Sequence, residues 1–262
     1  MMRSKIVLFG DSITEQSIRE NGWGVPLANA YSRRADILVR GYGGYNTKWA
    51  MFLLDHLFPL DSTKPPIATT IFFGANDAAL LGRTSERQHV PIEEFKENLR
   101  KFVRHLKQMA GCTLVLPSKA NILNAFWECS PTMVIVLITP PPLSEEGRLA
   151  YARSVNGENA TKIPERTNEV TGQYANACVE VAKEMGVWYI NLWSKMQETD
   201  GWQTKFLRDG LHLTTEGNAV VYEELIKVFD EAGLSAVNMP MDFPHHSKID
   251  SKHPERAFQQ HV

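Results

Sequence analysis

Cysteine is scarce in this chain. The 262 residues contain three, Cys112, Cys129 and Cys178, and none belongs to a Cys-x-x-Cys pair. An odd number of widely spaced cysteines fits neither a disulfide framework nor a zinc site built from thiolates. Long apolar runs are also missing, and none approaches the roughly 18 residues of a membrane span. The apolar run at residues 6–10 lacks a small-residue cleavage site, so we expect a cytoplasmic protein without signal peptide or membrane span.

Positive charge is not in excess either. The net charge is −2 at pH 7 and no basic cluster occurs, so we expect no nucleic-acid partner. No Gly-x-x-x-x-Gly-Lys-Ser/Thr loop is present. The run Gly41-Tyr42-Gly43-Gly44 is not a dinucleotide fingerprint, because Asn46 stands where the last glycine would be. The histidines near the C-terminus lack a supporting acidic scaffold, so we assign no metal, and we expect no cofactor.

Short apolar segments alternate with helical patterns along most of the chain. Strands are predicted at residues 5–10, 36–40, 68–73, 133–138 and 187–192. Helices are predicted at residues 25–34, 48–58, 92–109, 165–185 and 215–232. Such alternation requires right-handed crossovers and a parallel sheet covered on both faces. We therefore predict an α/β protein in which a five-stranded parallel sheet lies between two helical layers.

The chain shows no internal repeat and no linker that would divide it. We expect a single domain over residues 1–238, followed by a polar, flexible tail at 239–262 that contains three prolines. One connection, at about residues 110–131, is longer than links between a helix and a strand usually are.

A serine follows the first predicted strand. Lys5 to Phe9 form a short apolar run that ends at Gly10, and Ser12 comes two residues later. This places the hydroxyl at the carboxyl edge of the sheet, where ligands bind in open α/β folds. Backbone N–H groups at the start of a helix also favour an oxyanion there. Taken alone, Ser12 is also explained as a simple helix cap.

The loop Asp209-Gly210-Leu211-His212 precedes the last predicted helix. In a parallel sheet every strand-to-helix loop opens on the same edge, so this loop and Ser12 can meet. Serine is a weak nucleophile until a base takes its proton, and histidine, with an ordinary pKa of about 6.5, can do so near neutral pH. Asp209 lies close enough in the chain to orient His212. A cap and a surface histidine are the alternative interpretation.

Attack on an acyl carbon creates an oxyanion that needs hydrogen-bond donors. Candidates are the backbone N–H groups of Ser12 and Gly44 and the side-chain amide of Asn76, which follow three different predicted strands. Losing one such donor typically raises the barrier by about 2.7–4 kcal/mol. Gly44 and Asn76 are each also typical of ordinary turns.

These motifs resemble the SGNH (GDSL) hydrolase superfamily. Its four blocks appear in order as Gly10-Asp11-Ser12-Ile13, the Gly44 turn, Gly74-Ala75-Asn76-Asp77 and Asp209-Gly210-Leu211-His212. Further segments resemble more narrowly the isoamyl acetate-hydrolysing esterases in the form found in plants: residues 22–24, 40–42, 72–77, 137–142 and 174–178. The chain lacks Gly-x-Ser-x-Gly, since Thr14 occupies the last position.

The resemblance implies a flavodoxin-like three-layer sandwich, a Ser12–Asp209–His212 triad, and oxyanion donors from Ser12, Gly44 and Asn76. It also implies hydrolysis of small carboxylic esters without a cofactor. Against the family pattern, about residues 109–128 resemble an insertion at the edge opposite the active site.

We therefore expect a serine esterase that hydrolyses short-chain, acetyl-type esters through an acyl-enzyme. A carbohydrate O-acetylesterase, an acyltransferase with the same triad, and a catalytically silent binding module are the alternatives. The sequence leaves the oligomeric state open. Candidate substrate contacts are Asp11, Trp23, Tyr45, Trp49, Pro141 and Leu143.

Overall fold

A five-stranded sheet forms the centre of the computed structural model, which describes residues 3–111, 113–115, 126–128 and 133–258. The strand order is β2-β1-β3-β6-β7, and every neighbouring pair is parallel. This confirms the predicted five-stranded parallel sheet. The strands are β1 (Ser4–Gly10), β2 (Ala35–Gly41), β3 (Ala68–Phe72), β6 (Val134–Ile138) and β7 (Trp188–Ile190).

The strand β1 shows why the sheet is covered on both sides. Ile6 and Leu8 point into one hydrophobic cluster, whereas Val7 and Phe9 point into another. Successive side chains of a strand face opposite sides, so an uninterrupted apolar strand needs a layer of helices on each face.

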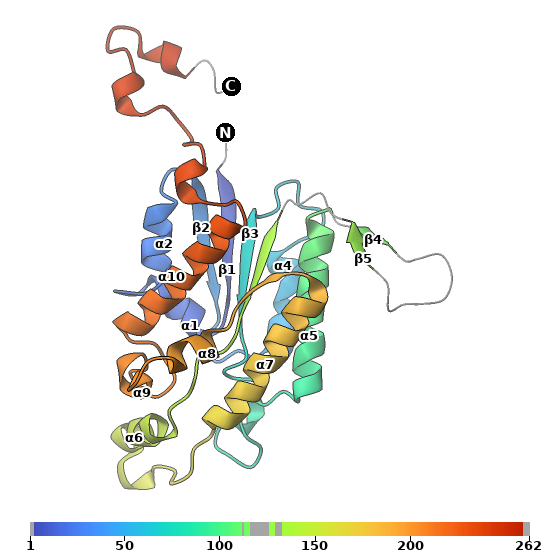
Figure 1. Ribbon diagram of the computed structural model, residues 1–262, viewed down its shortest axis with the longest axis vertical. Coiled ribbons are helices and arrows are strands. Elements are labelled where there is room, and N and C mark those ends of the chain that lie inside the picture. Colours follow the sequence, from blue (N-terminus) through green and yellow to red (C-terminus); the bar gives the residue numbers. More distant parts are fainter. Residues whose placement is uncertain (1–2, 112, 116–125, 129–132, 259–262) are drawn as a thin grey trace.

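Two helical layers enclose the sheet, as Figure 1 shows. One layer contains α2 (Gly24–Ala30), α8 (Leu192–Gln197) and α10 (Thr215–Glu231). The other contains α3 (Thr47–Ala50), α4 (Leu54–Leu57), α5 (Ile92–Met109) and α7 (Asn168–Met185). The predicted three-layer sandwich is therefore confirmed. The remaining α-helices are α1 (Ser12–Glu15), α6 (Glu145–Asn156) and α9 (Trp202–Lys205).

Some predicted helix limits differ from the structure. The expected helix at 48–58 is divided into α3, a 3-10 turn over Met51–Leu53, and α4. The helix expected from residue 165 begins at Asn168, because the Thr167 side chain accepts the N–H of Val170 as its cap. Helix α6 was not predicted; it buries none of its residues, so it lacks the apolar stripe that identifies a helix from sequence.

The segment interpreted as an insertion, 109–128, lies largely outside the described residues. Within it, β4 (Thr113–Val115) and β5 (Phe126–Glu128) form an antiparallel pair separate from the main sheet. Met109 ends α5. In the described part of the chain, no helix is both long and apolar enough to cross a membrane.

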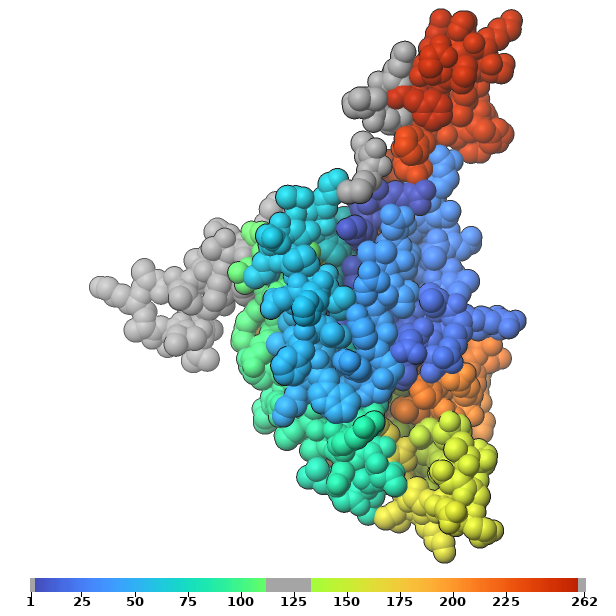
Figure 2. Space-filling model, turned by 180° about the vertical axis from the view of Figure 1, so that it is seen from behind, coloured from blue at the N-terminus to red at the C-terminus, as the bar shows by residue number. Residues whose placement is uncertain are grey.

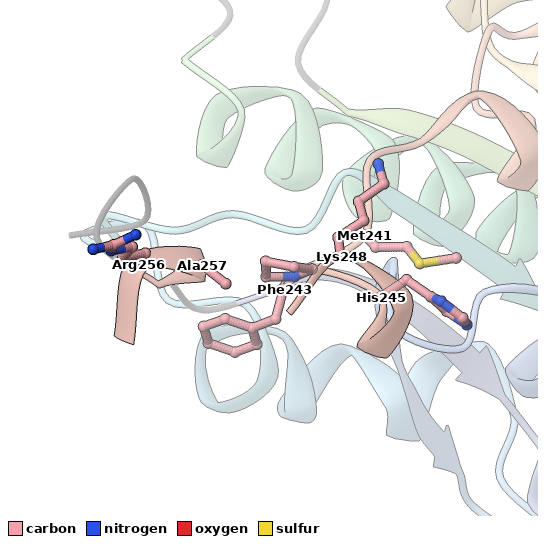
Figure 3. Close-up of a pocket in the computed structure, with 7 residues that line it drawn as sticks. Met241, Phe243, His245, Lys248, Arg256 and Ala257 are labelled. Carbon is pink, nitrogen blue, oxygen red and sulfur yellow. The ribbon is translucent and has the colours of Figure 1, made fainter. Parts of the chain in front are cut away.

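The C-terminal segment, residues 239–258, is attached at the end of the sheet where β1 and β2 begin. The Asp242 carboxylate accepts from Arg3 Nε at 2.7 Å and from Arg33 Nε at 3.2 Å. Beyond this attachment the segment stands clear of the sheet and its helices (Figures 1 and 2). A cavity of about 610 Å³ lies within it, lined by seven residues, of which six, among them Phe243 and Lys248, are labelled in Figure 3. This cavity is at the opposite end of β1 from Ser12.

Asp11 begins the short helix that carries Ser12. Its side chain is 1% exposed and accepts the N–H of Ile13 at 2.9 Å. Burial raises the pKa of Asp11 to about 7, with a further contribution from the charge of Asp77, although the bond from Ile13 acts in the opposite direction. The carboxyl group is therefore a buried cap whose protonation is linked to folding.

Phe9 is predicted to be a major source of stability. Its ring is fully buried and packs edge-on against Phe58, Phe73 and Phe102 at centroid distances of 5.6, 4.9 and 5.7 Å. Replacing Phe9 with alanine should lower the free energy of unfolding by about 3–5 kcal/mol in urea denaturation, because it leaves a cavity. Phe52→Ala, at a ring that is 78% exposed, should change it by less than about 0.5 kcal/mol. Equal losses would contradict this assignment of the core.

Asp11→Asn should flatten the dependence of stability on pH. Between about pH 4 and 7 the folded protein holds a proton that the unfolded chain has released, so stability falls as pH rises. The Asp11 carboxyl group can change the free energy of unfolding by up to about 1.4 kcal/mol per pH unit in this range. Urea denaturation from pH 4.5 to 7.5 measures the slope, and the exposed Asp61→Asn is the control. An identical slope in wild type and Asp11→Asn would disprove the linkage.

Candidate active site

The loop before α10 fixes a carboxylate against an imidazole. A bridge between Leu207 and Leu213 closes the loop. Asp209 Oδ1 accepts the backbone N–H groups of Leu211 at 3.0 Å and His212 at 2.7 Å. The second oxygen, Oδ2, lies 2.7 Å from His212 Nδ1. The carboxylate is thus held by its own loop and in turn holds the ring.

Ser12 reaches the other side of the same ring. Its Oγ lies 3.0 Å from His212 Nε2, although 200 residues separate the two positions. An ionised carboxylate only accepts hydrogen bonds, so Nδ1 carries the ring proton of neutral His212 and Nε2 is left to accept from the Ser12 hydroxyl. Ser12 is half-buried and the His212 side chain is 20% exposed, so an incoming molecule can reach both.

Asp209 remains ionised in this setting. Burial acts to raise its pKa, but the hydrogen bond and charge of His212 and the two backbone N–H groups together lower the pKa well below its usual range. Arg148 adds positive charge nearby, with Nη1 donating to the Asp209 carbonyl at 3.2 Å and lying 3.7 Å from Oδ2. The Asp209 carboxylate therefore keeps its negative charge beside the His212 ring.

Gly44 and Asn76 are brought together by a direct contact between their loops. Asn76 Nδ2 donates to the carbonyl of Tyr45 at 2.8 Å. The Gly44 loop in turn lies against the end of β1 and the last residue of α1, because Tyr42 N–H donates to the Gly10 carbonyl and Gly43 N–H to the Glu15 carboxylate. The structure therefore joins the loops after β1, β2 and β3 at one edge of the sheet.

These loops offer donors that are not engaged elsewhere. Within the described ranges, the backbone N–H groups of Ser12 and Gly44 have no hydrogen-bond partner. One hydrogen of the Asn76 amide also remains after its bond to Tyr45. Gly44 has φ +78°, a conformation that glycine adopts without strain. The arrangement can supply the donors that a developing oxyanion needs.

The six candidate substrate contacts divide into two groups. Asp11, Trp23, Pro141 and Leu143 are buried. The Trp23 ring packs in the core, and its Nε1 donates to the Ile13 carbonyl.

Tyr45 and Trp49 are half-buried, with rings 6.0 Å apart in an edge-to-face contact beside the Gly44 turn. They are the members of the set that a bound molecule can touch at this edge.

A buried polar network that the sequence pattern does not predict lies next to Asn76. It contains Gln88, Glu165 and Arg166, together with Arg148. The only local signal was an adjacent pair of opposite charges, Glu165 and Arg166, after a proline and before a helix. In the described part of the chain, no group of three or more His, Cys, Asp or Glu side chains is placed to hold a metal ion.

The chain is similar to known proteins along most of its length. Residues 6–225 match the family model described as GDSL-like Lipase/Acylhydrolase. A GDSL esterase/lipase of Arabidopsis thaliana is 62% identical over 259 residues, which cover 99% of each chain. An isoamyl acetate-hydrolyzing esterase 1 homolog of Bos taurus is 38% identical over 252 residues, 96% of this chain and 90% of the relative.

The fold is shared with a solved structure, a lipase/acylhydrolase of Enterococcus faecalis. The TM-score is 0.61 at 22% identity, over 88% of this chain and 97% of that one. The family expected from the motifs is thus confirmed: the chain belongs to the GDSL-like lipases and acylhydrolases and is an ester hydrolase.

Proposed function

We propose that the protein is a serine esterase that hydrolyses short-chain carboxylic esters through an acyl-enzyme. The observation that carries the proposal is the continuous chain from Ser12 Oγ through His212 to the ionised Asp209. Serine, base and orienting carboxylate lie at hydrogen-bond distances in the order that acyl transfer requires.

In the first half of the reaction, Ser12 Oγ attacks the acyl carbon while its proton passes to His212 Nε2. The carbonyl π electrons move to oxygen, and the N–H groups of Ser12 and Gly44 and the Asn76 amide bind that oxyanion. The tetrahedral intermediate then collapses, the bond to the alcohol oxygen breaks, and the alcohol leaves with the proton from Nε2. The acyl group remains on Ser12.

Water completes the cycle by the same path. His212 Nε2 takes a proton from water, the resulting hydroxide attacks the acyl carbon, and the proton returns to Ser12 Oγ as the carboxylic acid leaves. During each half-reaction Asp209 stabilises the imidazolium ion across the 2.7 Å bond to Nδ1. No cofactor enters any step of the proposed reaction.

The proposed preference for a short acyl chain rests on a relative of this chain, with two half-buried aromatic side chains at this edge of the sheet as candidate contacts. Pro141 and Leu143 are buried, and the half-buried Tyr45 and Trp49 lie beside the Gly44 turn. The relative named for hydrolysis of isoamyl acetate supports the same substrate class.

Hydrolysis of p-nitrophenyl esters from acetate to palmitate tests the proposal. Wild type should favour the shortest chains, and Ser12→Ala should lower kcat by at least about 10³-fold because the nucleophile is lost. The exposed Ser32→Ala is the matched control and should retain wild-type activity.

The same panel separates the alternatives. Preference for an acetylated sugar oligomer would indicate a carbohydrate O-acetylesterase, and ester formation with an added alcohol would indicate an acyltransferase. A folded wild type as inactive as Ser12→Ala on every ester would favour a silent binding module and refute the proposal.

Asp209→Asn should retain the fold yet lose most of its activity. An amide does not stabilise the imidazolium as a carboxylate does and favours the wrong ring tautomer, so kcat should fall by about 10³–10⁴-fold. The exposed Asp200→Asn should leave kcat unchanged. Steady-state kinetics, with circular dichroism to verify folding, provide the measurement. A folded Asp209→Asn variant with kcat within tenfold of wild type would show that Asp209 does not serve His212.

A further inference from the structure

Arg166 is a buried cation that directly contacts the loop that follows β3 and carries Asn76. The residue is 3% exposed, and its guanidinium donates through Nε to the Ala75 carbonyl at 2.8 Å. Through Nη2 it donates to Asn76 Oδ1 at 3.3 Å. Because Asn76 Nδ2 donates to the Tyr45 carbonyl, both ends of the amide are held. The Asn76 side chain is therefore fixed in one orientation.

The same guanidinium extends to the Gly44 turn through Gln88. Arg166 Nη2 donates to Gln88 Oε1, and Gln88 Nε2 donates to the Gly44 carbonyl at 2.9 Å. The Gln88 backbone carbonyl also accepts from Asn46 Nδ2 at 2.9 Å. Arg166 and Gln88 thus join the two loops that carry the Gly44 and Asn76 donors.

A shared carboxylate balances the buried charge and extends the network toward the triad. Glu165 Oε1 accepts from Arg166 Nη1 at 3.2 Å and from Arg148 Nε at 2.8 Å. Burial acts to raise the pKa of Glu165, but the charges of Arg148 and Arg166 lower it overall. Arg148 then donates to the Asp209 carbonyl at 3.2 Å. The chain of contacts runs from Gly44 to Asp209 through buried or half-buried groups.

We propose that Arg166 is a positioning residue for the oxyanion hole, holding Asn76 directly and Gly44 through Gln88. The inference rests on the proposed function of this site. A guanidinium that donates to the amide oxygen of Asn76 withdraws electron density and makes its N–H a stronger donor. It also holds the donors in place before charge develops on the substrate. Such preorganisation is the main reason that an oxyanion hole lowers the barrier of the reaction. A purely structural role would stabilise the fold without acting on the transition state.

Arg166→Met and Arg166→Lys test the proposal with p-nitrophenyl acetate. Methionine removes the charge, while lysine keeps the charge but cannot reproduce the forked contacts. Both should lower kcat by about 10²-fold, as a misplaced catalytic group does, and change KM by less than threefold. Gln88→Ala, which cuts only the link to Gly44, should lower kcat by about tenfold.

Arg100→Met is the matched control. Arg100 also binds a glutamate through two nitrogens, with Nε 3.0 Å and Nη2 2.9 Å from the Glu184 carboxylate, but it joins α5 to α7 away from the site. It should leave kcat and KM per folded molecule at wild-type values. Thermal denaturation of every variant gives the folded fraction used to normalise kcat.

Hydrogen exchange supplies a readout that does not require ester hydrolysis. Amides in residues 42–47 and 75–77 should exchange faster in Arg166→Met than in wild type, and they should be unaffected in Arg100→Met. If wild type hydrolyses no ester but this pattern appears, the proposed function fails while the positioning of the loops stands.

The inference is overturned by either of two results. One is an active Arg166→Met or Gln88→Ala whose normalised kcat stays within threefold of wild type. The other is unchanged exchange in both segments, whether or not wild type is active. A loss of activity that matches the loss of folded protein would likewise reduce Arg166 to a structural role.

Discussion

The rest of the site depends on the register of three parallel strands, β1, β2 and β3, whose carboxyl ends lie at the same height in the sheet. Register pairs Gly10 of β1 with Gly41 of β2 and with Phe72 of β3, so the three following loops leave the sheet side by side. Backbone hydrogen bonds set this register, and the two apolar layers prevent it from slipping, since a shift by one residue would turn buried side chains toward the wrong layer. Ser12, Gly44 and Asn76 are close together because the sheet places the loops that carry them side by side.

Hydrogen bonds among buried polar groups then fix the orientation of the side chains that these loops bring together. Two backbone N–H groups bind one oxygen of the Asp209 carboxylate while the other oxygen binds His212 Nδ1, and Asn76 is held at both ends of its amide. Such groups would destabilise the protein if left without partners in a low-dielectric interior. Because the partners of the Asn76 amide, Tyr45 and Arg166, come from other loops, its hydrogen bonds also fix these loops relative to one another. Stability and the precision of the site are therefore linked.

The site lies at one end of the sheet and the C-terminal segment is attached at the other. Ser12, Gly44 and Asn76 follow the carboxyl ends of β1, β2 and β3, with the loop of Asp209 and His212 beside Ser12, whereas Asp242 binds Arg3 at the start of β1. The antiparallel pair β4–β5, which follows the carboxyl end of α5 and precedes β6, lies outside the main sheet. Both segments thus lie where they need not alter the strand ends that position the candidate site residues.

The sequence by itself determined the layered fold, since apolar strands and amphipathic helices leave few other ways to bury both faces of a sheet. It also indicated which loops meet, because parallel strands direct their following loops to one edge, and its motifs indicated the family. Only the tertiary structure decided how Arg166, Gln88, Glu165 and Arg148 connect these loops. Their contacts join residues up to 91 positions apart, and no periodic pattern marks such side chains in advance. It also decided that α6 forms without an apolar stripe and that Trp23 lies in the core, because burial is a property of the assembled layers.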